Sequence, residues 1–495
     1  MRWPRSALAG FCLLVLAATV GRGAQEALPA FPGAEGFGAV ATGGRGGQVI
    51  KVTSLKAKGP GSLNAAVQAK GPRIVVFDVA GTIEGDVTIT QSDLTIAGQT
   101  APPPGITIEG ILKTRYRIEP PVANVILRFL RVRPPRRRGK WAGGDCLQIT
   151  RVDRLIIDHV ACSWGSDENM DLCGSSRATV QWCAIEEADT VGHSKGQHNY
   201  GMIIGYTDRG NVTIHHNLFA HCQKRAPLIG CETVDHRNNV LYNMLLPFIM
   251  HPVRMNRQRP GEPFRCNLVA NLFKPGPNVK AHMQGRPFDK LVWNRPCMHL
   301  YAEGNVCTWL DGPATSKAEP LAAKPWPAPP VATHSAEEAY ELVLAHAGCL
   351  PRDAVSRRTI DEVRTGTGSW GRREPARHPA ETLLREPPPP DADADGMPDA
   401  WERAHHLDPN DAADATATVP AGASPDVALW ADGLPREDVR LASGDFDGDG
   451  DPQLVVWDPG SGLHRIDTFP SGTQTPASLA AATITGANAL AKAGV

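Results

Sequence analysis

The sequence predicts an all-β fold, a parallel β-helix in which short strands stack into a solenoid. From about residue 74 to 310, short β-branched runs such as 74–77, 94–97 and 125–129 each precede a polar turn that contains Asn, Asp or Gly. Comparable runs recur roughly every 20 to 30 residues, which is a solenoid period. Over this stretch no long amphipathic pattern intervenes, which argues against alternating strand–helix units.

Asparagine recurs beside the predicted turns and supports the same fold class. Asparagine tolerates the left-handed backbone conformation and can bind its own backbone at tight bends. Stacked Asn side chains could also satisfy one another along a solenoid. Irregular spacing leaves a β-sandwich as the alternative, although the pattern favours the β-helix. The recurring residues are Asn124, Asn211, Asn217, Asn239, Asn243, Asn271 and Asn305.

Composition excludes some classes of function. The 495 residues include 51 Lys and Arg against 52 Asp and Glu, giving a formal net charge of −1. This balance argues against a nucleic-acid-binding protein, so an anionic partner would have to be held by local basic residues. The 11 cysteines form no CxxC motif, which argues against a zinc site of that type. Their spacing does not define disulfide pairing, and buried thiols fit the strand-like segments equally well.

The N-terminus has the features of a secretion signal. Arg2 and Arg5 precede an apolar run over 7–20, and small residues follow. This run is too short to span a bilayer, although an uncleaved membrane anchor is the alternative. We therefore expect a signal peptide over 1–24 and a secreted or periplasmic protein without membrane contact after its removal.

Residues 391–402 match a 12-residue, EF-hand-like calcium loop. Such loops carry carboxylates at positions 1, 3, 5 and 9, Gly at position 6, a backbone carbonyl ligand at position 7 and Glu at position 12. No catalytic group lies nearby in the sequence, so the pattern predicts a structural Ca²⁺ site, with a solvated acidic linker as the alternative. The predicted ligands are Asp391, Asp393, Asp395, Met397, Asp399 and Glu402.

A second group of charged residues lies in the middle coils. Positions about one coil apart lie side by side in a solenoid, so these residues could line one stripe of the outer face. Such a stripe suits an acidic polysaccharide, because Ca²⁺ can bridge protein and sugar carboxylates while Lys and Arg bind the others. A charged, solvated face is the alternative. The residues are Asp145, Asp167, Asp171, Lys195 and Arg225.

Several motifs carry a resemblance to a known family over roughly residues 30–310. They are FPGAEGFG at 31–38, TGGRGG at 42–47, GSL at 61–63, VAGTI at 79–83, LTIAGQTAP at 94–102, DH at 158–159 and HHN at 215–217. Together they resemble bacterial pectate lyases of polysaccharide lyase family 1, with the calcium loop as an appendage.

This resemblance implies a right-handed parallel β-helix that cleaves α-1,4-linked galacturonan by calcium-assisted anti β-elimination, giving 4,5-unsaturated oligouronides. Asp145, Asp167 and Asp171 match the calcium-ligand positions, with Glu168 as a substitute or helper. Lys195 matches a lysine that binds the substrate carboxylate. Arg225 matches the arginine that removes the C5 proton.

Three further expectations concern the basic and imidazole side chains. The pKa of an arginine exceeds 12, so Arg225 as the base requires a depressed pKa or high pH and predicts an alkaline optimum. The string RAPLIG at 225–230 lacks the second arginine of many relatives, and a basic run over 131–140 either compensates or forms a solvated loop. His198 joins Lys195 and Arg225 as a predicted substrate-binding residue, whereas most other histidines are expected to be structural.

The remaining expectations concern organisation and competing functions. The parts are a signal over 1–24, a β-helix lyase domain over 25–315, a Pro-rich segment with one helix over 316–390, the calcium loop and helix over 391–415, and a weakly patterned tail or small module over 416–495. Ser335 and Glu338 form a capping box that begins the single helix, and Gly348 ends it.

We expect a monomer whose partner is an acidic polysaccharide. The alternatives are a lyase for another uronate, a glycoside hydrolase, and a non-catalytic carbohydrate-binding β-helix protein. A hydrolase would need a pair of catalytic carboxylates, and the strings typical of polygalacturonases are missing from the sequence.

Overall fold

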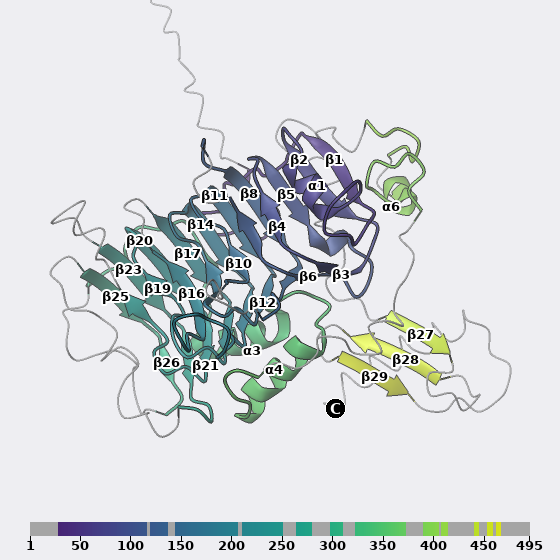
Figure 1. The fold of residues 1–495 in the computed structure, drawn as a ribbon. Coiled ribbons are helices and arrows are strands. Elements are labelled where there is room, and N and C mark those ends of the chain that lie inside the picture. The colour runs from purple at the N-terminus through teal and green to yellow at the C-terminus, as the bar shows by residue number, and fades with distance from the viewer. Residues whose placement is uncertain are drawn as a thin grey trace, which may run out of the picture.

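A computed structural model describes 28–115, 119–136, 144–205, 210–250, 264–279, 298–309, 322–372, 390–404, 407–413, 440–444, 453–458 and 462–466. Three parallel sheets of ten, seven and nine strands run along one solenoid (Figure 1). Successive strands of the chain join the three sheets in turn, so each complete coil adds a strand to each sheet. The predicted parallel β-helix is confirmed. The predicted signal peptide lies outside the described residues.

Each sheet adds one strand per coil, as the strand bounds show. The ten-stranded sheet contains β1 (Gln48–Val52), β2 (Arg73–Phe77), β5 (Leu94–Ala97), β8 (Ala123–Arg128), β11 (Asp153–Asp158), β14 (Ser176–Gln181), β17 (Asn211–His215), β20 (Thr233–Arg237), β23 (Phe264–Val269) and β25 (Met298–Glu303). The seven-stranded sheet contains β4 (Val87–Ile89), β7 (Leu112–Thr114), β10 (Leu147–Gln148), β13 (Glu168–Asp171), β16 (Tyr200–Ile204), β19 (Leu228–Ile229) and β22 (Ile249–Met250). The nine-stranded sheet contains β3 (Gly81–Glu84), β6 (Ile106–Glu109), β9 (Leu130–Val132), β12 (Ala161–Ser163), β15 (Ala184–Glu186), β18 (Leu218–Ala220), β21 (Val240–Tyr242), β24 (Leu272–Lys274) and β26 (Val306–Cys307).

The core is a set of apolar columns inside the solenoid. Strand register places Val125, Leu155, Ala178, Val212 and Val234 in one such column, and all five are fully buried. Alternate residues of a strand point to opposite faces, so a run such as β11 supplies two inward side chains, Leu155 and Ile157. This burial of apolar area stabilises the stack.

Left-handed residues make the corner between the ten-stranded and nine-stranded sheets. Phe129, His159, Trp182 and His216 all have φ between 52° and 54° at this corner, within two residues of the next strand. Their rings form a column in which Phe129 and His159 stack at 4.6 Å and Trp182 and His216 at 4.4 Å. Ring stacking therefore accompanies a conformation that side chains other than Asn and Gly seldom adopt.

The recurring asparagines form a hydrogen-bonded ladder beside this corner. The backbone N–H groups of Asn217, Asn239 and Asn271 donate to the side-chain oxygen of the next ladder residue, each at 3.0 Å, and Asn305 is the last acceptor. The predicted stacking is confirmed. Asn124 and Asn243 have the expected left-handed conformation, with φ of 63° and 54°. In the ladder, however, this conformation belongs to the preceding residue, as His216 shows for Asn217. The side chain of each ladder asparagine therefore makes the hydrogen bonds between coils, and the residue before it makes the bend.

Helices and extended segments cover the solenoid. Helix α1 (Leu63–Gln68), capped by Ser62, packs its apolar residues into the core beside β1 and β2, and a short 3-10 helix, η1, spans Gly98–Thr100. Helix α3 (Ala336–His346) begins with the predicted capping box of Ser335 and Glu338. Helices α3 and α4 (Ala354–Thr365) pack against the nine-stranded sheet (Figure 1). The expectation of a single helix over 316–390 is wrong, because Asp353 caps a second helix there.

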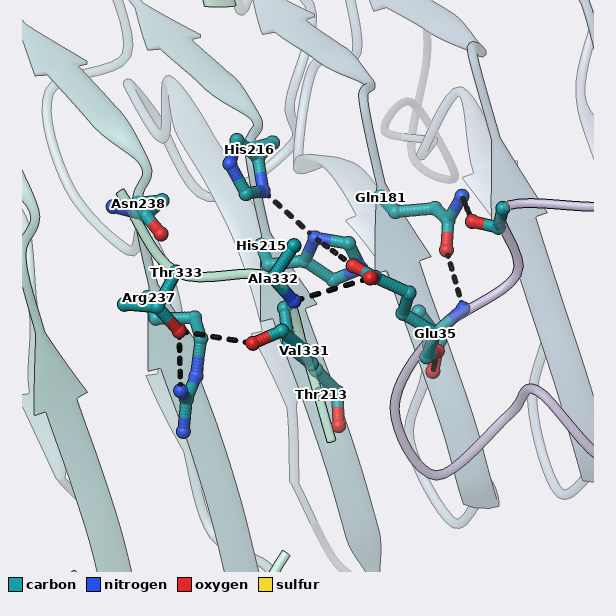
Figure 2. Close-up of polar contacts among 12 residues, drawn as sticks. Glu35, Gln181, Thr213, His215, His216, Arg237, Asn238, Val331, Ala332 and Thr333 are labelled. Carbon is teal, nitrogen blue, oxygen red and sulfur yellow. Dashed lines mark hydrogen bonds and ion pairs between the residues drawn. The ribbon is translucent and has the colours of Figure 1, made fainter. Parts of the chain in front are cut away.

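Two segments far apart in the sequence lie side by side on the ten-stranded sheet (Figure 2). The Glu35 carboxylate accepts a hydrogen bond from the Ala332 N–H at 3.1 Å, and the Glu35 N–H donates to Gln181 at 3.2 Å. His215 and His216 are joined through their Nδ1 atoms at 2.9 Å. Both segments are thus anchored to strand residues of successive coils.

The C-terminal part contains one short helix and one small sheet. Helix α6 (Asp399–Ala404) begins within the last four residues of the acidic loop. Strands β27 (Arg440–Gly444), β28 (Gln453–Asp458) and β29 (Gly462–Ile466) form an antiparallel sheet within the segment that the sequence predicted to be weakly patterned. The short apolar QLVVWD run of β28, rich in β-branched and aromatic residues, is the signal that would have predicted a strand there. Among the described residues, no helix is long and apolar enough to cross a membrane.

Candidate active site

The candidate site is built from consecutive strands of the seven-stranded sheet. Glu168 begins β13 and pairs in register with Tyr200, which begins β16. Asp145 lies just before β10, and Arg225 lies just before β19. The backbone oxygen of Arg225 accepts a hydrogen bond from the Met202 N–H at 2.6 Å, which fixes Arg225 beside β16. Residues from four coils therefore meet on one face.

Three carboxylates form the centre of this face. Asp145, Asp167 and Glu168 place one oxygen each within 4.8 Å of one another. The two oxygens of Asp145 accept hydrogen bonds at 3.0 Å from the Glu168 N–H and from the Gln148 amide. Burial raises the pKa of Asp145 well above its ordinary value, and the neighbouring Asp171 and Asp167 add to this effect. A hard divalent cation with oxygen ligands would relieve that repulsion, so the residues fit Ca²⁺.

Asp171 borders this group of three carboxylates. Its Oδ1 accepts a hydrogen bond from the Cys173 N–H at 2.7 Å, and burial raises its pKa. Glu168, which the motifs placed only as a helper, lies inside the group. The difference arises because Glu168 begins β13 beside Asp145, whereas Asp171 ends the same strand opposite Gln148.

Arg225 lies next to the carboxylates. Its guanidinium carbon lies 3.9 Å from the centre of the Tyr200 ring, and its Nη1 pairs with Glu168 Oε1. Burial lowers the pKa of Arg225, while the carboxylates of Asp167 and Asp145 oppose the shift. The stack on Tyr200 and the ion pair together hold the guanidinium in one orientation. Tyr200 was not predicted from the sequence, because an aromatic residue at the start of a strand carries no motif.

The loop between β15 and β16 carries the other predicted residues. Lys195 is exposed, and its N–H donates to His193 Nδ1 at 3.1 Å. His193 Nε2 lies 3.4 Å from Asp167 Oδ2, and His198 Nε2 lies 3.8 Å from Asp167 Oδ1. The structure therefore places His198 against a carboxylate of the candidate metal group. His193 was missed, although the short HSKGQH string was a signal for it.

The buried arginines of the basic run over 131–140 do not face the candidate site as substrate-binding residues. Arg131 and Arg133 are buried and pair with Asp353, which also caps helix α4. Arg136 pairs with Asp189 at 2.8 Å. Both earlier interpretations, a compensating substrate site and a solvated loop, are wrong for Arg131 and Arg133, because these residues anchor α4. Arg137, Arg138 and Lys140 lie outside the described residues.

The loop at 391–402 has the shape expected of a cation site. Asp391, Asp393 and Asp395 place oxygens within 4.8 Å of one another. Gly396 has φ +105°, which matches the sharp turn that glycine makes at position 6. The Glu402 side chain is fully buried, and Asp391 also pairs with Lys51 of β1. Asp399 Oδ1 accepts a hydrogen bond from the Ala392 N–H at 2.7 Å, which closes the loop on itself.

The described cysteines and most histidines are not part of the candidate site. The nine described cysteines are free, and burial raises the pKa of those such as Cys162 and Cys183. Burial likewise lowers the pKa of His216 to about 3, so this imidazole is neutral in the folded protein. These buried side chains are structural residues of the coils, as the sequence predicted for most of the histidines.

A parallel β-helix with acidic and basic side chains on one face of its seven-stranded sheet defines a class, the β-helix lyases of acidic polysaccharides. A family model described as "Pectate lyase" matches residues 17–254. The protein named "Probable pectate lyase C" from Aspergillus fumigatus is 34% identical over 406 residues, covering 78% of this chain and 90% of that protein. Its counterpart from Emericella nidulans is 40% identical over 219 residues, covering 44% and 48% of the two chains. The chain belongs to the pectate lyase family, and the predicted lyase activity is confirmed.

Two solved structures are also similar to the chain. The major allergen from cedar pollen, jun a 1, is 17% identical, with a TM-score of 0.45 over 64% of this chain and 93% of the allergen. A pectate lyase from a Paenibacillus species is 15% identical, with a TM-score of 0.42 over 64% of this chain and 95% of that enzyme. The two similar pectate lyase C proteins are fungal, whereas the sequence motifs resemble those of bacterial enzymes.

Proposed function

We propose that the protein cleaves polygalacturonate by calcium-assisted β-elimination at the face formed by Asp145, Asp167, Glu168 and Arg225. One observation carries this proposal: three carboxylates converge within 4.8 Å, and a guanidinium with a lowered pKa pairs with one of them. A cation site beside a basic group is what removal of a proton next to a carboxylate requires. Asp171 borders the group and supports it electrostatically.

Arg225 is the proposed base. The C5 proton of the sugar passes to Arg225, the C4–O bond to the leaving sugar breaks, a C4–C5 double bond forms, and the released oxygen takes a proton from water. When bound, Ca²⁺ neutralises the C6 carboxylate and makes the C5 proton more acidic. Tyr200 and Glu168 hold the guanidinium, and burial favours its neutral form. Lys195 is exposed at the edge of the site, where its ammonium can bind a neighbouring sugar carboxylate, and His198 lies beside it as a further substrate-binding group.

The loop at 391–402 is the proposed second calcium site, with a structural role. Asp391, Asp393, Asp395, Asp399 and Glu402 would supply carboxylate oxygens and Met397 its carbonyl. The other proposals concern organisation: a signal peptide over 1–24, a secreted or periplasmic monomer, and the five parts with their predicted bounds. The bacterial affiliation of the motifs stays a prediction.

The test of this function is an assay for the unsaturated product. The purified protein is incubated with polygalacturonate at alkaline pH, with Ca²⁺ and then with chelator, and the ultraviolet absorbance of the product is followed. We expect calcium-dependent absorbance, at least about 100-fold slower after Arg225→Ala, since loss of a general base typically costs that much. Arg265→Ala, on the ten-stranded sheet, is the matched control.

Other outcomes separate the competing functions. Reducing ends without absorbance would mean a hydrolase. Product from alginate but not from polygalacturonate would mean a lyase for another uronate. Retained binding without any product would mean a non-catalytic carbohydrate-binding protein, which the missing second arginine after Arg225 keeps as the second candidate.

A further inference from the structure

Two histidines face the carboxylate of Asp167 from one loop. Their ring centres lie 3.6 Å apart, and the Nε2 atom of each points toward Asp167. The side chain of His193 is 9% exposed and that of His198 is 16% exposed, so both imidazoles are largely shielded from water. One ligand atom from each of the three residues lies within 4.8 Å of the others. Two imidazole nitrogens and a carboxylate form a donor set different from the oxygen-only group beside it.

The tautomer of His198 follows from its second ring nitrogen. His198 Nδ1 lies 3.1 Å from the Gly196 carbonyl oxygen, which can only accept a hydrogen bond. The proton of a neutral His198 therefore lies on Nδ1, and the lone pair of Nε2 faces Asp167. Two acceptors that face each other require a cation between them or a second proton on the ring. An Nδ1–H bond to a backbone carbonyl is also the usual support of a metal-bound histidine.

His193 is arranged differently. Its Nδ1 accepts the Lys195 N–H at 3.1 Å, so a neutral His193 carries its proton on Nε2 and donates toward Asp167. In this state His193 orients the carboxylate. It becomes a third ligand when its proton moves to Nδ1, which breaks the bond from Lys195. That amide belongs to an exposed turn, where water can replace the lost bond.

We propose that Asp167, His193 and His198 form a binding site for a divalent transition metal of the zinc class. Imidazole nitrogen suits Zn²⁺, Cu²⁺ and Ni²⁺, whereas Ca²⁺ prefers oxygen. Tetrahedral bonds to zinc of about 2.0–2.1 Å imply about 3.3 Å between two ligand atoms. His193 Nε2 lies 3.4 Å from one oxygen of Asp167, and His198 Nε2 lies 3.8 Å from the other, both near this value. The two rings, whose centres lie 3.6 Å apart, must separate for both Nε2 atoms to bind one metal.

The site shares Asp167 with the carboxylate group proposed to hold Ca²⁺. A zinc ion that takes the Asp167 carboxylate withdraws one of the three converging oxygens and adds a second dication nearby. Zinc and calcium therefore exclude each other, and zinc inhibits the enzyme. The competition rests on the proposed function, whereas zinc binding itself does not.

The first experiment measures zinc binding without an activity assay. Calcium-free protein is titrated with ZnCl₂ by calorimetry, as wild type, His198→Gln and His193→Gln, with the exposed His299→Gln as the matched control. We expect one site that His198→Gln weakens about 10–100-fold or more, the loss typical of disturbing a metal site. His299→Gln should bind as the wild type does. Equal zinc affinity in wild type and His198→Gln, or no zinc binding at all, would overturn the proposal.

The second experiment identifies the ligands and the competition. Co²⁺ replaces Zn²⁺ as the probe, and its visible absorption reports nitrogen coordination. We expect that band in wild type and its loss in His198→Gln at an unchanged melting temperature. Saturating Ca²⁺ should weaken zinc binding, and zinc affinity that is independent of Ca²⁺ would overturn the shared use of Asp167. Zinc binding in a protein that forms no unsaturated product would sink the proposed lyase function and leave the metal site standing.

Discussion

At the scale of single residues, the orientation of Arg225 depends on a cation–π contact with one neighbour and an ion pair with another. The Tyr200 ring lies under the guanidinium at 3.9 Å, and Glu168 binds its edge. The ion pair favours the charged form of Arg225, whereas burial favours the neutral form, and the lowered pKa shows that burial dominates. The Tyr200 ring and the Glu168 carboxylate thus both position the arginine, while burial favours its neutral form.

Removing the Tyr200 ring should therefore reduce activity. We expect Tyr200→Ala to lower kcat/KM about 2–30-fold, since a cation–π contact contributes about 0.5–2 kcal/mol. Tyr200→Phe keeps the ring and should stay within about 2–3-fold of wild type. Steady-state kinetics on polygalacturonate at saturating Ca²⁺ test this. Equal losses in both variants would mean that the hydroxyl matters and the stack does not.

The shifted pKa values also predict the pH dependence of the reaction. Burial raises the pKa of Asp145 and Asp171, so protons displace the cation at a higher pH than for ordinary carboxylates as the solution is acidified. Burial lowers the pKa of Arg225, so its neutral form grows as pH rises. Both effects make kcat/KM increase with pH. A profile that is flat or falls toward alkaline pH would contradict Arg225 as the base.

The Arg225→Lys variant is a further test of Arg225 as the base. A lysine has an ordinary pKa of about 10.4, below that of arginine, so Arg225→Lys should shift the alkaline limb of the profile toward lower pH. Its maximal rate should fall because the side chain cannot reproduce the flat stack on Tyr200.

Sequence reasoning found the charged residues of the site but not their grouping. Asp145, Asp167 and Arg225 could be predicted because they lie in strings separated by whole coils. The central place of Glu168 could not, because strand register and side-chain direction decide between neighbours on one strand. His193 was missed for a similar reason, since its position depends on how a loop folds against Asp167.

At the scale of elements, the asparagine ladder shows what a solenoid period can and cannot predict. Repetition predicted that Asn side chains would stack, and Asn217, Asn239 and Asn271 do so. The same repetition did not predict that Phe129 and Trp182 would take left-handed corners, where their backbone conformation is stabilised by packing across coils. Propensity alone would have assigned those corners to Asn or Gly.

Replacing an asparagine that has ladder neighbours on both sides should lower the free energy of unfolding. Asn239 is fully buried, and its Oδ1 accepts from both the N–H and the amide of Asn217. Asn239→Ala leaves these donors unsatisfied, so we expect a loss of about 2–4 kcal/mol in the free energy of unfolding. Asn211→Ala, at the half-buried start of β17, should cost less than about 0.5 kcal/mol. Chemical denaturation of the two variants measures this, and similar midpoints would contradict a stabilising ladder.

At the scale of the whole molecule, the chain brings its acidic loop back to its first coil. Lys51 of β1 pairs with Asp391, which lies 340 residues further along the chain, and α6 lies beside β1 and α1 (Figure 1). Strand β1 is the edge of the ten-stranded sheet. An open sheet edge is prone to pairing with other chains, so a loop docked beside β1 helps to protect that end. A cation in the loop would stabilise both the loop and this contact.

Two cation sites with different roles should be separable by paired variants. Asp395→Asn should remove one Ca²⁺ from the binding stoichiometry, lower the calcium-dependent rise in melting temperature and leave kcat close to wild type. Asp145→Asn should remove the other Ca²⁺ and the activity, while the loop keeps its contribution to stability through ligand binding. Calorimetric titration, thermal unfolding with and without chelator, and the absorbance assay measure the three effects. Asp411→Asn, an exposed carboxylate beyond α6, controls for the loss of charge. If Asp395→Asn abolished activity as completely as Asp145→Asn, the loop would have a part in catalysis and its purely structural role would be wrong.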